Sequence, residues 1–170
     1  MKLHNLLTAF FIFSLTAITA GCDNKGAQKS EVVYIDVAKA IIDSPLATQE
    51  KARLDQVRKI LINAGDDAAK NYKGMDKNKA EQARVADTEV LNRQWVLEQR
   101  ATRGIVLKKL ESAINDLRQK KKYAIIINRN AVLSAADGSD VTDEVVTLLK
   151  DTKLNFGKLP EISVKAKAEN

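Results

Sequence analysis

This 170-residue chain has little of what most enzymes and disulfide-linked proteins depend on: it holds one cysteine, one histidine, seven glycines and two prolines, and 5% of its residues are aromatic. The histidine, His4, lies in an N-terminal segment that we predict to be removed. Ser-His and Cys-His nucleophilic sites and the usual zinc sites are therefore excluded. No glycine-rich phosphate loop is present either. We expect a protein that is not an enzyme, with no catalytic residue, no metal site and no cofactor.

The N-terminal residues 1–21 are predicted to be a lipoprotein signal peptide. Their apolar run, Leu6 to Ala20, is too short to span a bilayer. It leads into Cys22, the lone cysteine, and small residues before a cysteine resemble a lipobox, although Thr19 stands where leucine is usual. We predict that Cys22 is acylated and anchors the mature protein to a membrane. The alternative is ordinary secretion with a chance cysteine.

The residues after Cys22 refine this prediction. Asp23 resembles the inner-membrane retention signal of enteric lipoproteins, so we suspect the inner membrane. Residues 22–30 are polar and contain glycine, which is typical of a flexible tether.

The longest feature is a charged stretch of predicted helix, residues 45–122, with a short β-rich segment on each side. Two strands this far apart can pair only if the helical stretch goes out and returns, so we expect an antiparallel hairpin, the arm, that projects from a small body. Ser44-Pro45 is typical of a helix start, and Gly74 suits a turn in the left-handed conformation. The first helix should end near Tyr72, and the second should run from about Lys77 to Lys122.

Apolar residues predict how the two helices pack. The first helix should contact the second through a heptad seam formed by Leu54, Val57, Leu61, Ala64 and Ala68. The stripe of the second helix, which shifts phase on the way, is Ala83, Ala86, Val90, Leu97, Ala101, Ile105, Leu110, Ala113 and Leu117. Alanine near the tip should leave the distal arm loosely packed. Trp95 is interpreted as a packing residue.

The second helix is longer than the first and should overhang at the base of the arm. The overhang is its most apolar part, so it needs cover from the body and from another subunit. We predict an oligomerisation surface formed by Ile105, Leu110, Ile114, Leu117 and, from the body, Ile126.

Basic and acidic side chains are distributed unevenly along the chain. The arm carries 18 basic and 11 acidic side chains, a net +7, whereas the rest of the chain from Asp23 carries 9 and 11, a net −2. A basic surface attracts anionic partners. Nucleic acid is not expected outside the cytoplasm, so we predict binding of acidic polypeptides near the tip of the arm, at Lys70, Lys73, Lys77 and Lys79. The alternative is an ordinary solvated helix surface.

The body, residues 31–44 and 123–153, should contain β-structure, which makes the fold class α+β. Val32 to Val37 alternates, and the run Ala124 to Ile127 is typical of a strand buried on both faces. Asn130 to Ser134 could form a third strand. Asp140 should cap a short helix from Val141 to Leu149. Residues 154–170 should form a mostly disordered tail.

Two stretches of the body resemble the Skp/OmpH family of periplasmic chaperones: residues 123–133 (YAIIINRNAVL) and residues 140–145 (DVTDEV). The resemblance, which covers about residues 31–150, implies a homotrimer whose arms enclose unfolded outer-membrane proteins without using ATP. The predicted lipid anchor and the tail depart from the family. They favour an alternative, a lipid-anchored coiled-coil adaptor or scaffold that bridges the membrane to an envelope partner.

Overall fold

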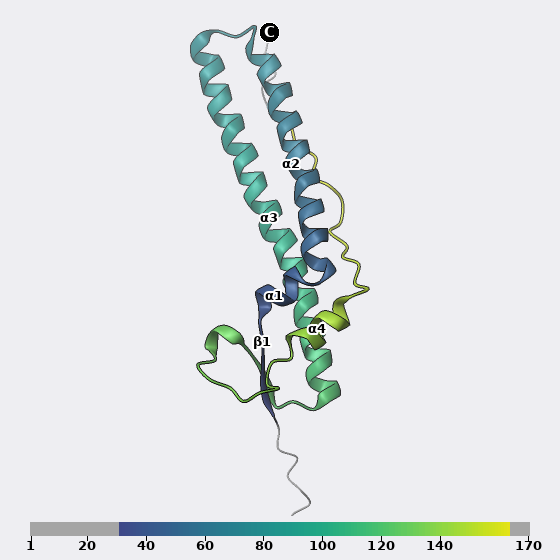
Figure 1. Cartoon of the computed structure of the whole chain (residues 1–170). Helices are drawn as coiled ribbons and strands as arrows, with labels where there is room; N and C mark the ends of the chain where they lie inside the picture. Colours follow the sequence, from purple (N-terminus) through teal and green to yellow (C-terminus); the bar gives the residue numbers. More distant parts are fainter. Residues whose placement is uncertain (1–30, 164–170) are drawn as a thin grey trace, which may run out of the picture.

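The computed structural model describes residues 31–163, which form a long helical hairpin on a small body (Figure 1). The elements, in chain order, are β1 (Val32–Ile35), α1 (Val37–Ile42), α2 (Pro45–Tyr72), α3 (Lys77–Lys121), β2 (Ile125–Asn128), a 3-10 turn (Arg129–Ala131) and α4 (Thr142–Leu149). The predicted α+β class, with an antiparallel helical arm projecting from a β-containing body, is confirmed. None of the helices within residues 31–163 has an apolar stretch long enough to cross a bilayer.

Several predictions concern residues outside this range. The signal peptide of residues 1–21, the tether of residues 22–30 with Cys22 and Asp23, and residues 164–170 of the tail all lie outside the described residues.

The ends of the two long helices follow from capping. The Ser44 hydroxyl accepts a hydrogen bond from the Leu46 amide at 3.4 Å, and the proline that follows Ser44 is the first helical residue. The Asp76 carboxylate starts α3 by accepting from the amides of Asn78 at 2.9 Å and Lys79 at 3.4 Å. Gly74 is not in the left-handed conformation that we expected. The turn is closed instead by the Met75 amide, which donates to the Tyr72 carbonyl at 3.1 Å.

The body holds a two-stranded parallel sheet. β1 pairs with β2 in a register that sets Val32 beside Ile125 and Val33 beside Ile126. The third strand predicted at residues 130–134 is wrong, because the Asn128 side chain accepts from the Asn130 amide at 3.2 Å and bends the chain into the 3-10 turn. The other side of β1 makes only an isolated bridge, between Tyr34 and Asp140.

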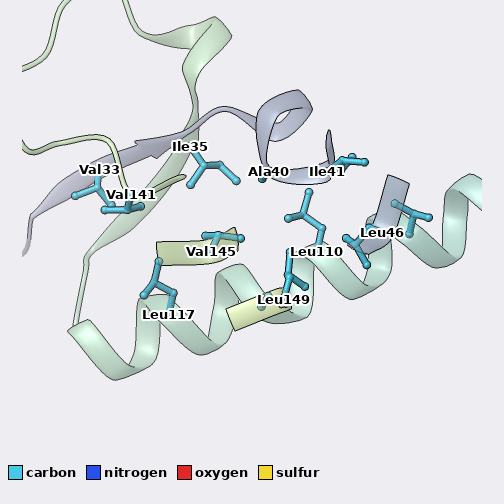
Figure 2. Packing of buried hydrophobic residues seen from close by; sticks show 12 residues of the cluster. Val33, Ile35, Ala40, Ile41, Leu46, Leu110, Leu117, Val141, Val145 and Leu149 are labelled. Carbon is cyan, nitrogen blue, oxygen red and sulfur yellow. The ribbon is translucent and has the colours of Figure 1, made fainter. Parts of the chain in front are cut away.

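One hydrophobic core joins the base of α3 to the body. In Figure 2, Leu110 and Leu117 point from α3 into a cluster that α4 lines with Val145 and Leu149. The remaining buried members of the cluster are Val33, Ile35, Ala40, Ile41, Leu46, Val106, Ala113 and Val141. The overhang of α3 is thus covered by the body of its own chain. Each fully buried side chain of this size stabilises the fold by ~1.5–3 kcal/mol.

One hydroxyl group and one carboxylate group hold the start of α4 in place. The Thr142 hydroxyl accepts from the Asp36 amide at 2.9 Å, so the start of α4 is tied to the start of α1. The Asp140 carboxylate accepts from the Thr142 amide at 2.9 Å, but Asp140 is not the N-cap residue that we predicted, because that position is taken by Val141. The helix begins at Thr142, one residue later than expected.

The apolar strand β2 is less covered than its sequence suggests. Ile126 and Ile127 are half-buried, and Ile125 is 48% exposed, so the strand is not buried on both faces. Its second edge pairs with nothing within residues 31–163. The reason is that residues 31–163 supply only two strands, which pair with each other along one edge.

The tail also differs from the expectation of disorder. Residues 154–163 form no helix or strand, yet the chain runs along α2 toward the tip of the arm (Figure 1). Leu154 and Phe156 pack against the core cluster, and the Leu154 amide donates to the Gln49 side chain at 2.8 Å. The proline and lysines of the tail suggested disorder, but these apolar side chains anchor it.

Candidate functional surface

The contact between α2 and α3 is more polar than the predicted seam. On α2 the buried positions include Val57, Leu61 and Ala68, as expected. On α3 the seam passes through Ala83, Asp87, Leu91, Gln94, Glu98 and Thr102, at steps of three and four residues. It then continues without a change of phase through Val106, Leu110, Ala113 and Leu117.

The predicted stripe of α3 was therefore wrong between residues 86 and 101. Val90, Leu97 and Ala101 are exposed, and the phase shift that we inferred came from following apolar side chains off the seam. A periodic search for apolar residues misses a seam whose members are charged or amide side chains.

Charged and hydroxyl groups connect the two helices along this seam. Arg53 and Glu98, both largely buried, lie 3.4 Å apart, and Arg103 lies 3.0 Å from the buried Glu50. The Arg53–Glu98 pair fixes the register of the two helices because either partner left alone would be a largely buried, uncompensated charge; in the other pair this holds for Glu50, since Arg103 is half exposed.

A second polar contact holds the distal arm. The Tyr72 hydroxyl donates to the buried Asp87 carboxylate at 2.7 Å. Burial, and then this hydrogen bond, raise the pKa of Tyr72 to about 12. The tip is thus held by a tyrosine–carboxylate contact that the alanine-rich sequence did not indicate.

Several apolar residues of α3 lie outside the seam, on what we call its outer face. This outer face comprises Val85, Val90, Val96, Leu97 and Leu107, which are all exposed. Val85 and Val96 lie about 160° around the helix from the neighbouring seam positions, whereas Val90, Leu97 and Leu107 each lie about 60° from one and so border the seam. Basic residues, Arg93 and Arg100, lie among them and are exposed too. The outer face is therefore an exposed surface that is both apolar and basic.

The four predicted lysines lie at the tip. Lys70 is near the end of α2, Lys73 is in the turn, Lys77 and Lys79 are in the first turn of α3, and all four are exposed. Lys70 pairs with Asp67 at 2.6 Å, and this hydrogen bond raises the pKa of Lys70. Their role in binding stays a prediction.

The five residues predicted to form an oligomerisation surface differ in exposure. Leu110 and Leu117 are buried in the core of their own chain, so their burial needs no second subunit. Ile105, Ile114 and Ile126 are half-buried. An interface through these three stays a prediction.

The sheet offers another surface that sequence reasoning did not single out. Val32 and its neighbour Ile125 are 57% and 48% exposed, on the face opposite the buried Val33. Tyr34 and Ile127 continue this face and are half-buried, and the Arg129 guanidinium lies 5.6 Å from the centre of the Tyr34 ring.

Trp95 borders a groove rather than the centre of the seam. It is half-buried, and the Arg58 guanidinium lies 5.1 Å from the centre of its ring. The groove, of about 650 Å³, is also lined by Ile42 and Leu54 from the first helices. Trp95 is therefore only partly a packing residue, because its side chain also lines the groove.

Comparison with known proteins shows a likeness to a solved structure. No protein-family model matches the chain, and no curated protein matches it. The chain is similar to a crystal structure from Caulobacter crescentus CB15 described, provisionally, as an outer membrane chaperone (OmpH-like). The TM-score is 0.38 and the identity 22%, over 69% of this chain and 82% of that one. The fold class stated above follows from the chain's own elements.

Proposed function

We propose that this protein is an ATP-independent holdase chaperone of the periplasm that binds unfolded outer-membrane proteins along its arms. The observation that carries the proposal is the placement of side chains on α3. Three valines and two leucines lie on the exposed outer face, whereas Asp87, Glu98 and Thr102 lie on the seam.

This placement is opposite to the one that stability alone favours. Fully burying a valine or leucine stabilises by ~1.5–3 kcal/mol, and burying charged groups is favourable only where they are well paired. An arm that needed only to fold would keep Val90 and Leu97 on the seam. Exposed on a projecting arm, they suit a partner that brings apolar surface of its own.

Charge supports the same partner. The net +7 of the arm would draw acidic unfolded chains toward it, and Lys70, Lys73, Lys77 and Lys79 would act at the tip. Capture would then depend on charge, and retention would depend on apolar contact with the outer face.

We further propose a homotrimer, held by lipid anchors at Cys22 to a membrane, which Asp23 suggests is the inner membrane. A two-stranded sheet is marginal by itself, and the open edge of β2 with exposed Ile125 suits pairing between subunits. Ile105, Ile114 and Ile126 would extend the contact.

The test follows the aggregation of an unfolded β-barrel protein diluted from denaturant, with and without the chain from Asp23 onward. The unlipidated chain should suppress aggregation. Replacing Val90 and Leu97 together by serine should weaken binding at least about tenfold, since each forgoes roughly 1 kcal/mol of burial. Leu133→Ser is the matched control, because Leu133 is fully exposed on the body and far from the arm.

Two results would contradict the proposal in different ways. Full suppression by the double variant would show that the outer face is not the binding surface. No suppression by the original chain would favour the second candidate, the lipid-anchored adaptor. An adaptor would retain few, folded envelope partners, and cross-linking in cells would identify these in place of many unfolded ones.

A further inference from the structure

The end of the described chain is bound to α2 through its backbone. We call residues 152–163 the C-terminal segment. The Gln49 amide nitrogen donates to the Thr152 carbonyl at 2.8 Å, and the Gln49 amide oxygen accepts from the Leu154 amide at 2.8 Å. One helical turn further along α2, Arg53 donates to the carbonyls of Lys158 at 2.7 Å and Gly157 at 3.3 Å. None of these contacts uses a side chain of the C-terminal segment, so they demand no particular sequence.

The side chains of the segment follow the pattern of an extended chain. Thr152, Leu154 and Phe156 are half-buried, while Lys153 and Asn155 between them are exposed. Alternation with a period of two is the pattern of β-strands. The strands of membrane β-barrels have the same alternation of apolar and polar residues. The surface of α2 thus accommodates the kind of chain that an unfolded β-barrel protein offers.

The site is built around a buried cation. Arg53 is 7% exposed, and its Nε atom has no hydrogen-bond partner among the described residues. Glu98, at 3.4 Å, is the acidic partner of its Nη2 atom. The C-terminal segment itself contributes to this burial, so when it leaves, the N–H groups bonded to its carbonyls must find other acceptors. An occupant that supplies backbone carbonyls satisfies these N–H groups, as the C-terminal segment does.

We propose that the surface of α2 around Gln49 and Arg53 is a binding site for extended polypeptide, and that the C-terminal segment occupies it as an intramolecular competitor of unfolded clients. The inference rests on the proposed holdase function. It adds a backbone-binding site at the base of the arm and a device that keeps this site closed until a client displaces the segment.

Gly157 makes the segment a better ligand than an ordinary extended chain. Consecutive carbonyls of an extended chain point to opposite sides. Gly157 has φ +71°, and with it two consecutive carbonyls reach Arg53. A Cβ atom at Gly157 would meet nothing within 4 Å, so alanine there strains the backbone without a clash. Gly157→Ala should loosen the segment and leave the site on α2 intact.

The experiment measures the Kd of a fluorescently labelled, urea-unfolded β-barrel protein for the full chain from Asp23 onward. Gly157→Ala should tighten binding several-fold, up to about tenfold, because a weaker internal competitor leaves more of the site open. Gly138→Ala is the matched control, since Gly138 has φ +82° and equally open surroundings but lies in the body. Adding Gln49→Met to Gly157→Ala should reverse the gain in affinity, because the double variant lacks the side-chain amide that pairs with the client backbone.

Hydrogen exchange gives a second readout on the unmodified chain. Adding the unfolded protein should speed exchange of the Leu154 amide, which loses its bond to Gln49 when the segment leaves. If the client binds while Leu154 stays protected and Gly157→Ala leaves the Kd unchanged, the segment is a structural strap and the inference is wrong, with the holdase function intact. If no version of the chain binds the unfolded protein, the holdase function itself fails and the inference fails with it.

Discussion

Replacing Ile125 by alanine distinguishes a chain that acts alone from one that assembles through its sheet. In the single chain about half of this side chain is already covered, since 48% is exposed. Truncation should then cost only on the order of 1 kcal/mol, half the value of full burial. In an assembly that covers the exposed face of the sheet, the same change would also remove contacts with the partner and leave a cavity. The total loss of stability would then be ~2–5 kcal/mol. Leu110→Ala is the comparison, because Leu110 is 2% exposed within its own chain and should cost ~2–5 kcal/mol in either case.

Urea unfolding followed by circular dichroism at two protein concentrations, with light scattering for the mass, measures both effects. If the chain assembles, the unfolding midpoint should rise with concentration. Ile125→Ala should weaken that dependence, whereas Leu110→Ala should lower the midpoint and preserve the mass. The trimer would be refuted if the chain is a monomer at micromolar concentration and Ile125→Ala causes a small loss of stability that does not depend on concentration.

Three further predictions concern the anchor and the arm. Cys22→Ser should release the protein from membranes, as fractionation would reveal, because the acyl chains supply the binding energy; a variant that stays bound would refute lipidation. The pKa of Tyr72 is raised from 10.0 to about 12, so its contribution to stability is complete below pH 10 and is lost as the pH rises toward 12. Tyr72→Phe should therefore be less stable at neutral pH, and its stability should not fall between pH 10 and about 12 in unfolding experiments. If the variant still loses stability over that pH range, another group causes the loss. Raising salt should slow client capture several-fold with little change in release. The same slowing in stopped-flow experiments should follow charge reversal of Lys70, Lys73, Lys77 and Lys79, and capture rates indifferent to both changes would make the basic arm a solubility feature.

The layout of the chain could be predicted from local signals. Ser44 and Pro45 mark the start of α2, and the limits of both long helices follow from residues within a few positions of each end. The unequal helix lengths then required an overhang whose apolar residues need cover, and the body of the same chain covers Leu110 and Leu117, which we had assigned to an oligomerisation surface. These inferences succeed because they depend on short-range sequence and on chain length.

The seam of α3 could not be predicted in the same way. Asp87 is buried because Tyr72 donates to it, and Glu98 is buried because Arg53 lies beside it. Each partner is 15 or more positions away in the sequence. A charged residue at a seam position therefore looks like a surface residue until the partner helix is in place. A search for apolar periodicity then selects the exposed Val90 and Leu97 in place of the true seam residues.

The C-terminal segment was missed for a related reason, which bears on its function. Gln49 and Arg53 contact carbonyl and amide groups that every residue of a polypeptide carries, so apart from the glycine at position 157 the contacts leave no trace in the residues of the segment. The alternation of Thr152, Leu154 and Phe156 was the sequence signal that could have indicated an ordered chain, and our prediction of disorder overlooked it. The property that hides the segment from sequence analysis is the one a holdase needs, because a site that binds backbone can accept clients of unrelated sequence. The Leu154 amide, which Gln49 protects, is therefore the most direct probe of whether clients and the segment share one site.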